Sequence, residues 1–337
     1  MKTAVWYGGK NIRIEDTPKP DVRDDDVLVK VNAVAICGSD LHAYKGMSKR
    51  RKPPLVMGHE FSGEIIKLGK KVKRFSDGEC VVVEPLISCG KCKPCKIGKT
   101  NVCENRKLIG LDSSGAFAEY VSVPENKCHK LLNNVSFEEA ALVEPLAVAV
   151  HAVSITPIEK GDTVLIIGSG TIGLLTMQVA KNANASKIIA TDVYDYLLDL
   201  AKKLGADMVI NTKNDDPLKT ISSNFGSVDV VFEAVGLQGT VQQALSIVRC
   251  GGCVTLIGML EDKMELNMLN VAVKEIMIQG SYGYTSDDFD QALKLIASGK
   301  VKVKPLITHV LPLNDITKGF ELLAGKKQNV IKVVLKP

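Results

Sequence analysis

Long hydrophobic runs are missing from this chain. No stretch of its 337 residues approaches the roughly 20 consecutive apolar residues that a membrane-spanning helix requires. The N-terminal segment, MKTAVWYGGK, also lacks the apolar core of a signal peptide. With 45% hydrophobic residues, the composition is that of a soluble globular protein. We therefore expect a cytoplasmic protein with no membrane partner.

A strong charge of one sign is missing as well. The net charge of +5 on 337 residues is too mild to indicate a nucleic-acid partner. Basic residues do gather at 49–52 and 70–74, but no aromatic residues are interleaved with them. Both runs are interpreted as solvated loops, and no nucleic-acid binding is predicted.

Repeats, low-complexity tracts and long linkers are absent, but the length exceeds what one hydrophobic core usually supports. Short alternating segments with frequent turns, typical of antiparallel strands, fill the chain up to about residue 147. The pattern then changes to strand–helix–strand, with buried strands expected at 163–167, 187–191, 228–232, 253–257 and 276–280. An amphipathic helix and a terminal strand follow residue 284. We predict an α/β protein with a parallel sheet and the divisions 1–147, 148–284 and 285–337.

Four of the nine cysteines form one compact motif. Cys89, Cys92, Cys95 and Cys103 have the C-x2-C-x2-C-x7-C spacing of a tetrahedral thiolate cage for Zn²⁺. Four thiolates leave no position for a substrate, so this zinc is predicted to be structural. An iron–sulfur cluster uses similar spacings, although the proline of the bacterial ferredoxin run is missing. A zinc ribbon binding nucleic acid through the neighbouring lysines is the other alternative.

A dinucleotide fingerprint follows the strand at 163–167. Gly168, Gly170 and Gly173 form a G-x-G-x-x-G motif that opens an apolar helix, and Asp192 ends the next strand. The predicted cofactor-binding residues are Gly168, Gly170, Thr171, Ile172, Gly173 and Asp192. The Asp192 carboxylate would accept from both ribose hydroxyls and repel a 2′-phosphate, which favours NAD over NADP. A purely structural strand–turn–helix is the alternative reading of this motif.

A second group of possible metal ligands is spread along the chain. Cys37 follows an alternating strand, His59 and Glu60 follow a proline pair, and Glu144 precedes the change of pattern. A thiolate, an imidazole and a carboxylate leave a fourth coordination position open, as in catalytic zinc sites. Each residue alone also has a structural explanation, as a buried cysteine, a capping histidine or a surface glutamate.

Taken together, these motifs resemble the zinc-dependent medium-chain dehydrogenase/reductase superfamily, and within it the sorbitol (L-iditol) and butanediol dehydrogenase branches. The resemblance covers essentially the whole chain. It is carried by Cys37-Gly-Ser-Asp, Gly58-His-Glu, the four-cysteine loop, Leu142-Val-Glu-Pro, the glycine motif and Val303-Lys-Pro-Leu-Ile-Thr-His. It implies a GroES-like β-barrel catalytic domain, rejoined by the C-terminal segment, and a Rossmann domain.

The resemblance also implies residue roles. Cys37, His59 and Glu60 would hold the catalytic zinc, with Glu144 binding the metal or its water. Zinc would polarise the alcohol oxygen of a small-molecule substrate and NAD would accept the hydride. The proton would pass to Ser39 and onward through the nicotinamide ribose to His42. Two zinc ions per chain and a homotetramer or homodimer are expected.

Two departures from the sorbitol dehydrogenases concern the substrate. Their Arg-Tyr pair is replaced by Gly283-Tyr284, and a tyrosine of that branch is replaced by Ala43, with Tyr44 beside it. Smaller diols, as in the butanediol dehydrogenases, are therefore an alternative to hexitols. Polyol phosphates are another alternative if residues 49–52 line the pocket rim. Glu144 argues against threonine dehydrogenases, which typically carry Asp-Pro there. A zinc-stabilised, NAD-binding regulatory protein is the non-enzymatic alternative.

Overall fold

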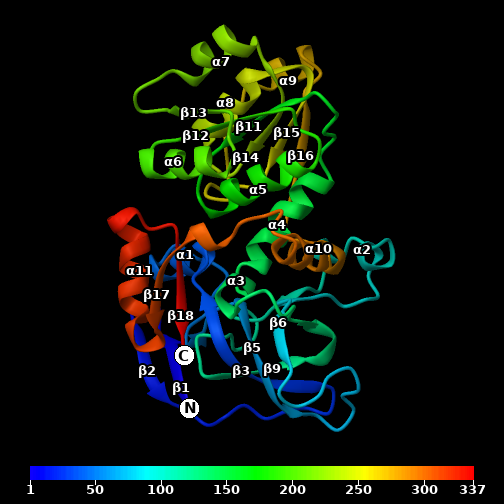
Figure 1. Cartoon of the computed structure of the whole chain (residues 1–337), viewed down its shortest axis with the longest axis vertical. Coiled ribbons are helices and arrows are strands. Elements are labelled where there is room, and N and C mark those ends of the chain that lie inside the picture. The colour runs from blue at the N-terminus through cyan, green and yellow to red at the C-terminus, as the bar shows by residue number, and fades with distance from the viewer. The chain divides into compact units, whose positions relative to one another are not determined.

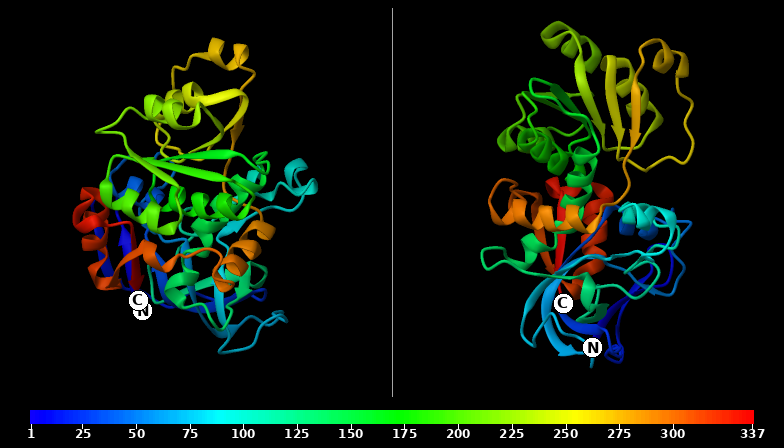
Figure 2. Two further views of the ribbon diagram at one scale, coloured as in Figure 1. Left: turned by 45° about the horizontal axis from the view of Figure 1, so that its top comes forward. Right: turned by 90° about the vertical axis from the view of Figure 1, so that its right-hand side faces the viewer.

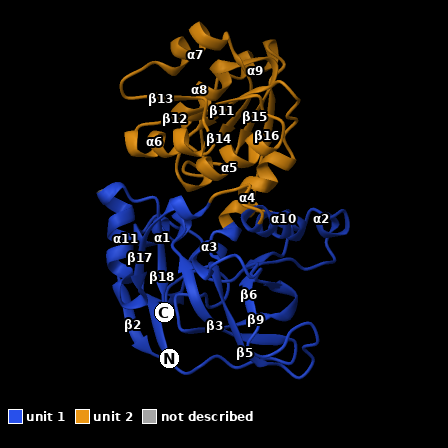
Figure 3. Ribbon diagram, viewed as in Figure 1, with its two compact units in different colours: residues 1–144, 285–297, 303–337 blue, residues 145–284, 298–302 orange. Residues whose placement is uncertain are grey.

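A computed structural model describes the backbone of residues 1–337 and every side chain except that of Lys327. The chain forms two units, coloured separately in Figure 3. Unit 1 comprises residues 1–144, 285–297 and 303–337, and unit 2 comprises residues 145–284 and 298–302. We expected the first boundary at residue 147 and assigned all of 285–337 to the first domain. The structure differs in both details, because residues 145–147 and 298–302 group with unit 2.

Unit 1 is built mainly from β-strands, most of which are labelled in Figure 1. Its strands are β1 (Lys2–Trp6), β2 (Ile12–Asp16), β3 (Asp26–Ala35), β4 (Leu55–Val56), β5 (Glu60–Leu68), β6 (Cys80–Val83), β7 (Leu86–Ile87), β8 (Lys107–Leu108), β9 (Tyr120–Pro124), β10 (Cys128–Lys130), β17 (Ile307–Pro312) and β18 (Lys332–Lys336). Its helices are α1 (Gly38–Tyr44), α2 (Lys93–Lys96), α3 (Phe137–Ala140), α10 (Ser286–Ala297) and α11 (Ile316–Gly325). Helix α4 (Val143–Ser154) begins in unit 1 and continues into unit 2.

A seven-stranded sheet forms the centre of unit 1. Its strand order is β10-β6-β5-β3-β18-β17, and β9 also pairs with β3. The C-terminal strand β18 thus lies beside β3, which is antiparallel to it. All residues of β3 except Lys30 and Asn32 are buried, and Val27, Val29, Val31 and Val34 belong to the hydrophobic core of unit 1. The sheet places the ends of β3, β5 and β18 together, which matters for the metal site.

The C-terminal segment completes the core of unit 1. The Phe320 ring of α11 stacks on the Tyr44 ring of α1 with centroids 4.7 Å apart, and Phe117 meets Phe320 edge-on at 6.1 Å. All three side chains are at most 1% exposed. Aromatic contacts of this size hold α1, and with it the residues after Cys37, against the return segment.

Unit 2 contains a six-stranded parallel sheet with the order β13-β12-β11-β14-β15-β16. Helices cover both faces: α5 and α6 pack together, and α7, α8 and α9 form another group (Figure 2). The strands are β11 (Thr163–Ile167), β12 (Lys187–Asp192), β13 (Met208–Asn211), β14 (Val228–Glu233), β15 (Val248–Leu256) and β16 (Met277–Gly280). The helices are α5 (Thr171–Asn182), α6 (Asp195–Leu204), α7 (Pro217–Phe225), α8 (Gln238–Ile247) and α9 (Met268–Val273).

This arrangement confirms the predicted doubly wound parallel sheet. Among the described residues, no helix has both the length and the apolar character needed to cross a bilayer.

Candidate metal centres and nucleotide site

Neighbouring strands bring the first metal set together in unit 1. Cys37 follows β3, and Glu60 begins β5, where it pairs directly with Ala35 of β3. His59 immediately precedes this strand. One ligand atom from each of Cys37, His59 and Glu60 lies within 4.8 Å of the others. Three donors of the kinds zinc prefers therefore converge, and they leave a fourth position free.

The glycine before His59 is required by its surroundings. Gly58 has a φ of +93°, and a Cβ there would lie 2.7 Å from the Phe117 ring and 2.9 Å from the Phe117 nitrogen. A side chain at this position would push the chain away from Phe117 and move the two ligands that follow. The Gly-His-Glu sequence is thus a geometric requirement of the site.

Asp40 connects two of the ligands, a role that the sequence analysis did not predict. Its buried carboxylate accepts a hydrogen bond from the Cys37 nitrogen at 3.2 Å and lies 3.5 Å from Nδ1 of His59. Burial opposes its charge, but His59, Arg51 and the Cys37 N–H hold the pKa of Asp40 below its usual value. A carboxylate behind a ligating histidine fixes the orientation of its ring.

The same contacts raise the pKa of His59. Burial disfavours the imidazolium, but Asp40 and Cys37 outweigh it, and the pKa of His59 lies well above its ordinary value. A bound Zn²⁺ would replace that proton, because histidine ligates in its neutral form. The donor set therefore fits a divalent cation, because the contacts of His59 with Asp40 and Cys37 favour positive charge at this position.

Lys332 of β18 was missed by the sequence analysis. Its Nζ, on a side chain only 4% exposed, donates to Oε1 of Glu60 at 2.8 Å. Burial lowers the pKa of Lys332, but Glu60, Cys37 and Glu144 outweigh this effect and raise it. Glu144 is itself buried at the start of α4, yet it lies outside the close three-residue set. Its charge raises the pKa of Lys332 together with the charges of Glu60 and Cys37.

Ser39 and His42 lie on α1, whose N-cap is Cys37. The two side chains are three residues apart and so share one face of the helix. Ser39 is exposed, and its hydroxyl accepts from Arg51 Nη2 at 3.2 Å. Partial burial, Lys45 and Arg51 lower the pKa of His42, so the neutral imidazole that accepts a proton persists to lower pH.

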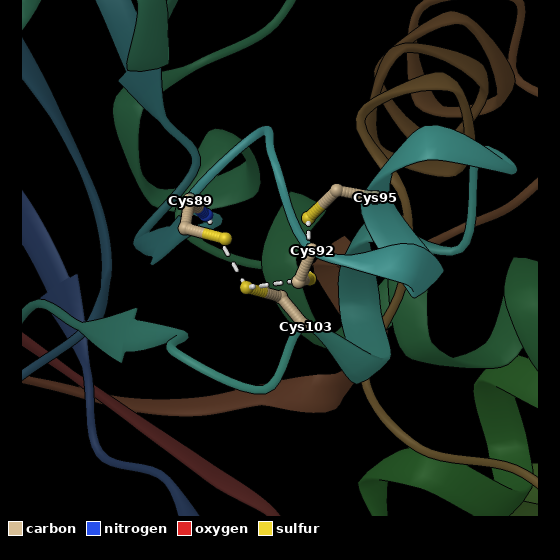
Figure 4. A group of neighbouring side chains, drawn as sticks. All are labelled: Cys89, Cys92, Cys95 and Cys103. Atoms are coloured by element: carbon tan, nitrogen blue, oxygen red, sulfur yellow. Dashed lines mark hydrogen bonds between the residues drawn. The ribbon is translucent and has the colours of Figure 1, made fainter.

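The four-cysteine loop forms a second centre in unit 1. The side chains of Cys89, Cys92, Cys95 and Cys103 point toward one another (Figure 4), and their sulfurs all lie within 4.8 Å. The Sγ of Cys92 lies 3.4 Å from that of Cys95 and 3.7 Å from that of Cys103. Tetrahedral zinc with Zn–S bonds of about 2.3 Å separates its sulfurs by about 3.8 Å. These spacings fit a zinc cage and are far too long for disulfides.

The acidities of the thiols in this loop also fit a metal-binding role. Backbone N–H groups of Lys91 and Cys92 lower the pKa of Cys89 to about 6. Burial and the neighbouring sulfurs raise the pKa of Cys95 to about 12. Closely packed thiols resist ionising together unless a metal ion supplies the compensating charge. The lysines around the loop, Lys91, Lys93, Lys96 and Lys99, are all exposed, as expected of a solvated face.

The nucleotide fingerprint lies entirely in unit 2. Gly170 is the N-cap of α5, and no side chain caps this helix end. A Cβ at Gly173 would lie 1.7 Å from the Gly168 carbonyl oxygen, so only glycine allows the helix to approach the loop this closely. Thr171 and Ile172 form the first turn of the helix. The N–H groups at the start of a helix are a typical binding site for a pyrophosphate.

Asp192 stands at the end of β12, beside the glycine loop. One carboxylate oxygen accepts from the Ser169 nitrogen at 2.8 Å, and the other accepts from the Val193 and Tyr194 nitrogens at 2.7 and 3.1 Å. These bonds fix the carboxylate while leaving lone pairs for a ribose. Lys213 is a nearby cation that the sequence analysis did not consider, and its Nζ lies 4.9 Å from the centre of the Tyr194 ring.

Comparisons with known proteins identify the family. Residues 23–133 match the model of the alcohol dehydrogenase GroES-like domain, and residues 171–298 match that of the zinc-binding dehydrogenases. The chain is 36% identical to a sorbitol dehydrogenase of Bacillus subtilis, over 100% of this chain and 97% of the relative. It is 38% identical to an L-threonine 3-dehydrogenase of Bacillus licheniformis, over 100% of this chain and 99% of that relative.

Solved structures agree. The 2R,3R-butanediol dehydrogenase of Bacillus subtilis superposes with a TM-score of 0.92 at 34% identity, covering 100% of this chain and 99% of that one. A putative zinc-binding dehydrogenase of Sinorhizobium meliloti bound to NADP gives 0.93 at 31% identity, with the same coverage. An Escherichia coli protein described as a short chain alcohol dehydrogenase, complexed with NADH, gives 0.94 at 30% identity, again with this coverage.

The chain therefore belongs to the zinc-dependent medium-chain dehydrogenase/reductase superfamily, in the branch that includes sorbitol and butanediol dehydrogenases. It is an oxidoreductase that works with zinc and a nicotinamide cofactor.

Proposed function

We propose that this protein is an NAD-dependent zinc dehydrogenase that interconverts a secondary alcohol of a diol or short polyol and the corresponding ketone. The carrying observation is the three-ligand set of Cys37, His59 and Glu60, which leaves one metal position open. The superfamily supplies the reaction class. The closed thiolate cage holds a second, structural zinc, so we propose two zinc ions per chain.

Zinc at the open set would polarise the alcohol oxygen, and the nicotinamide would accept the hydride. The chain itself orients the ligands and manages the proton. Asp40 fixes His59, while the Ser39 hydroxyl accepts the substrate proton and passes it toward His42. The lowered pKa of His42 keeps its imidazole neutral and therefore able to accept. Direct ligation by Glu144 is a further proposal; its position suits a role in holding a water or a second substrate oxygen.

NAD is proposed over NADP because of Asp192. Its carboxylate is held by three backbone N–H groups, so it cannot turn away from a 2′-phosphate. Lys213 offsets part of this repulsion, but its ammonium lies over the Tyr194 ring.

The proposed substrate is a small diol, on three observations. Gly283 supplies no donor where the sorbitol dehydrogenases carry an arginine. Tyr44 cannot replace the missing tyrosine, because its ring is 1% exposed and stacks on Phe320. Arg51 turns inward to Asp40, so the basic run at 49–52 does not present all four cations to a phosphate. A hexitol or a polyol phosphate therefore lacks partners for its additional hydroxyls or its phosphate, which a four-carbon diol does not need.

We also propose a homo-oligomer, either a homodimer or a homotetramer. Strand β16 is an edge of the unit 2 sheet, so its outer N–H and C=O groups are unpaired within the sheet. Large apolar side chains near this edge are half exposed or more: Met259, Met268, Leu269, Val273 and Met277. An apolar patch beside an open strand is the kind of surface that a second copy covers.

A spectrophotometric assay of NADH formation tests the proposal. The panel should contain butane-2,3-diol stereoisomers, erythritol, sorbitol, galactitol 1-phosphate, L-threonine and ethanol, compared by kcat/KM. We expect the four-carbon diols or tetritols to match or exceed the hexitols. Ethanol as the best substrate would remove the diol assignment, and L-threonine as the best substrate would redirect it to an amino-acid alcohol.

A further inference from the structure

The basic run at residues 49–52 contains one residue that behaves unlike its neighbours. Lys49, Arg50 and Lys52 are exposed, whereas Arg51 is only 7% exposed. A guanidinium is rarely buried without specific partners, because desolvating a charge is unfavourable. The position of Arg51 therefore calls for an explanation that its neighbours do not need.

Its partners are two consecutive residues of α1. Nη2 donates to Oδ1 of the buried Asp40 at 2.8 Å and to Oγ of Ser39 at 3.2 Å. Nη1 donates to the backbone carbonyl of Ser39 at 2.8 Å. Asp40 anchors the guanidinium, since its carboxylate is fully buried and lies 2.8 Å from Nη2. Ser39 is thereby held by both its backbone oxygen and its hydroxyl oxygen.

This contact gives the Ser39 hydroxyl a direction. Arginine offers only donors, so the Ser39 oxygen must accept from it and the Ser39 O–H must point elsewhere. One lone pair of Oγ is occupied by Arg51 and one remains. The hydroxyl can then accept a proton only on its remaining lone pair, and it donates its own proton in the direction of its O–H bond.

We propose that Arg51 is a positioning residue for proton transfer: it orients Ser39 so that the hydroxyl accepts the substrate proton on its free lone pair. The Ser39 proton leaves in the same event toward His42, so the hydroxyl is neutral before and after. The alcohol loses one proton by this route and one hydride to NAD, which becomes NADH. The inference rests on the proposed function, because it assigns the relay at the same site.

Two substitutions separate orientation from charge. Arg51→Lys keeps a cation beside Asp40 but lacks the rigid fork that holds three acceptors at once. Arg51→Met removes both the positive charge and the hydrogen-bond donors. It also leaves the buried Asp40 carboxylate without its ion-pair partner, so this variant is expected to fold less stably. Arg50→Met, in the exposed neighbouring position, is the matched control. All variants are made in the full-length, zinc-loaded protein.

The first readout is crystallographic and does not depend on turnover. In the wild type we expect a single Ser39 rotamer, with Oγ bonded to the guanidinium. In Arg51→Lys we expect several Ser39 rotamers or a displaced one. An unchanged Ser39 rotamer in Arg51→Lys would overturn the proposal, whatever the activity. If the wild type oxidises no alcohol, the proposed function fails while this readout still decides the role of Arg51.

The second readout is a double-mutant cycle with Ser39→Ala. Arg51→Lys should lower kcat by about 10-fold or more in the wild-type background, with the KM for NAD and the zinc content unchanged. The same change in the Ser39→Ala background should lower kcat less than about 3-fold, because a residue that acts through Ser39 has nothing left to orient. Equal losses in both backgrounds, or no loss in the wild type, would contradict the proposal.

Discussion

Charge compensation among a few buried residues governs the open metal centre. Cys37, Glu60 and Glu144 contribute negative charge, and Lys332 opposes it from β18. Sequence reasoning found the first three, because their motifs are local and suit zinc. It could not find Lys332, whose partner Glu60 is 272 residues away and whose surroundings look like an ordinary strand. Asp40 and Arg51 were missed for a related reason: a motif gives residue types but not the contacts behind them.

Removing the Lys332 ammonium should destabilise the metal-free protein selectively. Lys332→Met leaves Glu60 buried without its partner, which typically costs about 3–5 kcal/mol. Zinc should recover part of this loss, since it supplies positive charge to the same anions. Urea unfolding with and without zinc measures both effects. Lys336→Met, which removes an exposed lysine of the same strand, should cost less than about 1 kcal/mol. Equal costs for the two variants would show that Lys332 does not compensate the site.

Cofactor preference is also decided at single residues. Asp192→Ala combined with Val193→Arg should shift preference toward NADP by about 1–3 kcal/mol, because a repulsion becomes an ion pair. The structure adds an expectation: NAD affinity should fall as well, since Asp192 also holds the Ser169 nitrogen. The measurement is kcat/KM for both cofactors. Asp195→Asn is the control, because the Asp195 carboxylate already accepts a hydrogen bond from the side chain of Asn211. A wild type that prefers NADP would refute the assignment.

At the scale of elements, the most accurately predicted strands and helices are those with the strongest sequence patterns. Strand β11 and the helix after it were expected where they occur, because an apolar run followed by glycines has few alternatives. Strand β13 was not predicted, because its four residues are too short to show a period. Strand β17 was not predicted either, because its pairing with β18 depends on contacts within the unit 1 sheet.

The four-cysteine loop is an element that depends on its metal. It contains the short helix α2, one 3-10 turn at Thr100–Val102 and the two-stranded sheet of β7 and β8, so it has little regular structure of its own. Cys95→Ser should release this zinc and lower the midpoint of thermal unfolding by several degrees, because a structural zinc contributes folding free energy. Cys250→Ser, at an exposed cysteine elsewhere, is the control. An unchanged midpoint and two retained zinc ions in Cys95→Ser would contradict a structural role.

Across the whole molecule, the sequence predicted both architectures because their signals differ: alternation before residue 147, strand–helix repetition after it. It could not predict that residues 298–302 group with unit 2, since no composition change marks them. Self-association was implied only by the family resemblance. The exposed apolar residues near β16 give that expectation a definite surface.

Introducing charge on that surface should dissociate the oligomer. Leu269→Glu with Val273→Glu places two carboxylates where the native side chains are 73% and 75% exposed. Folding should survive, since neither side chain is buried, and NADH binding should persist. Light scattering after gel filtration reports the mass. Ile97→Glu, at another exposed site, in the cysteine loop, should leave the mass unchanged. A wild type that is already monomeric would remove the proposal.

The ratio of zinc to chain in wild type and Cys37→Ser tests the central claim most directly, namely that unit 1 holds one closed and one open zinc centre. The account predicts two zinc ions in freshly prepared wild-type protein and one in Cys37→Ser, with the fold retained and turnover lost. One zinc ion or none in unchelated wild type, or two in an inactive Cys37→Ser, would contradict it.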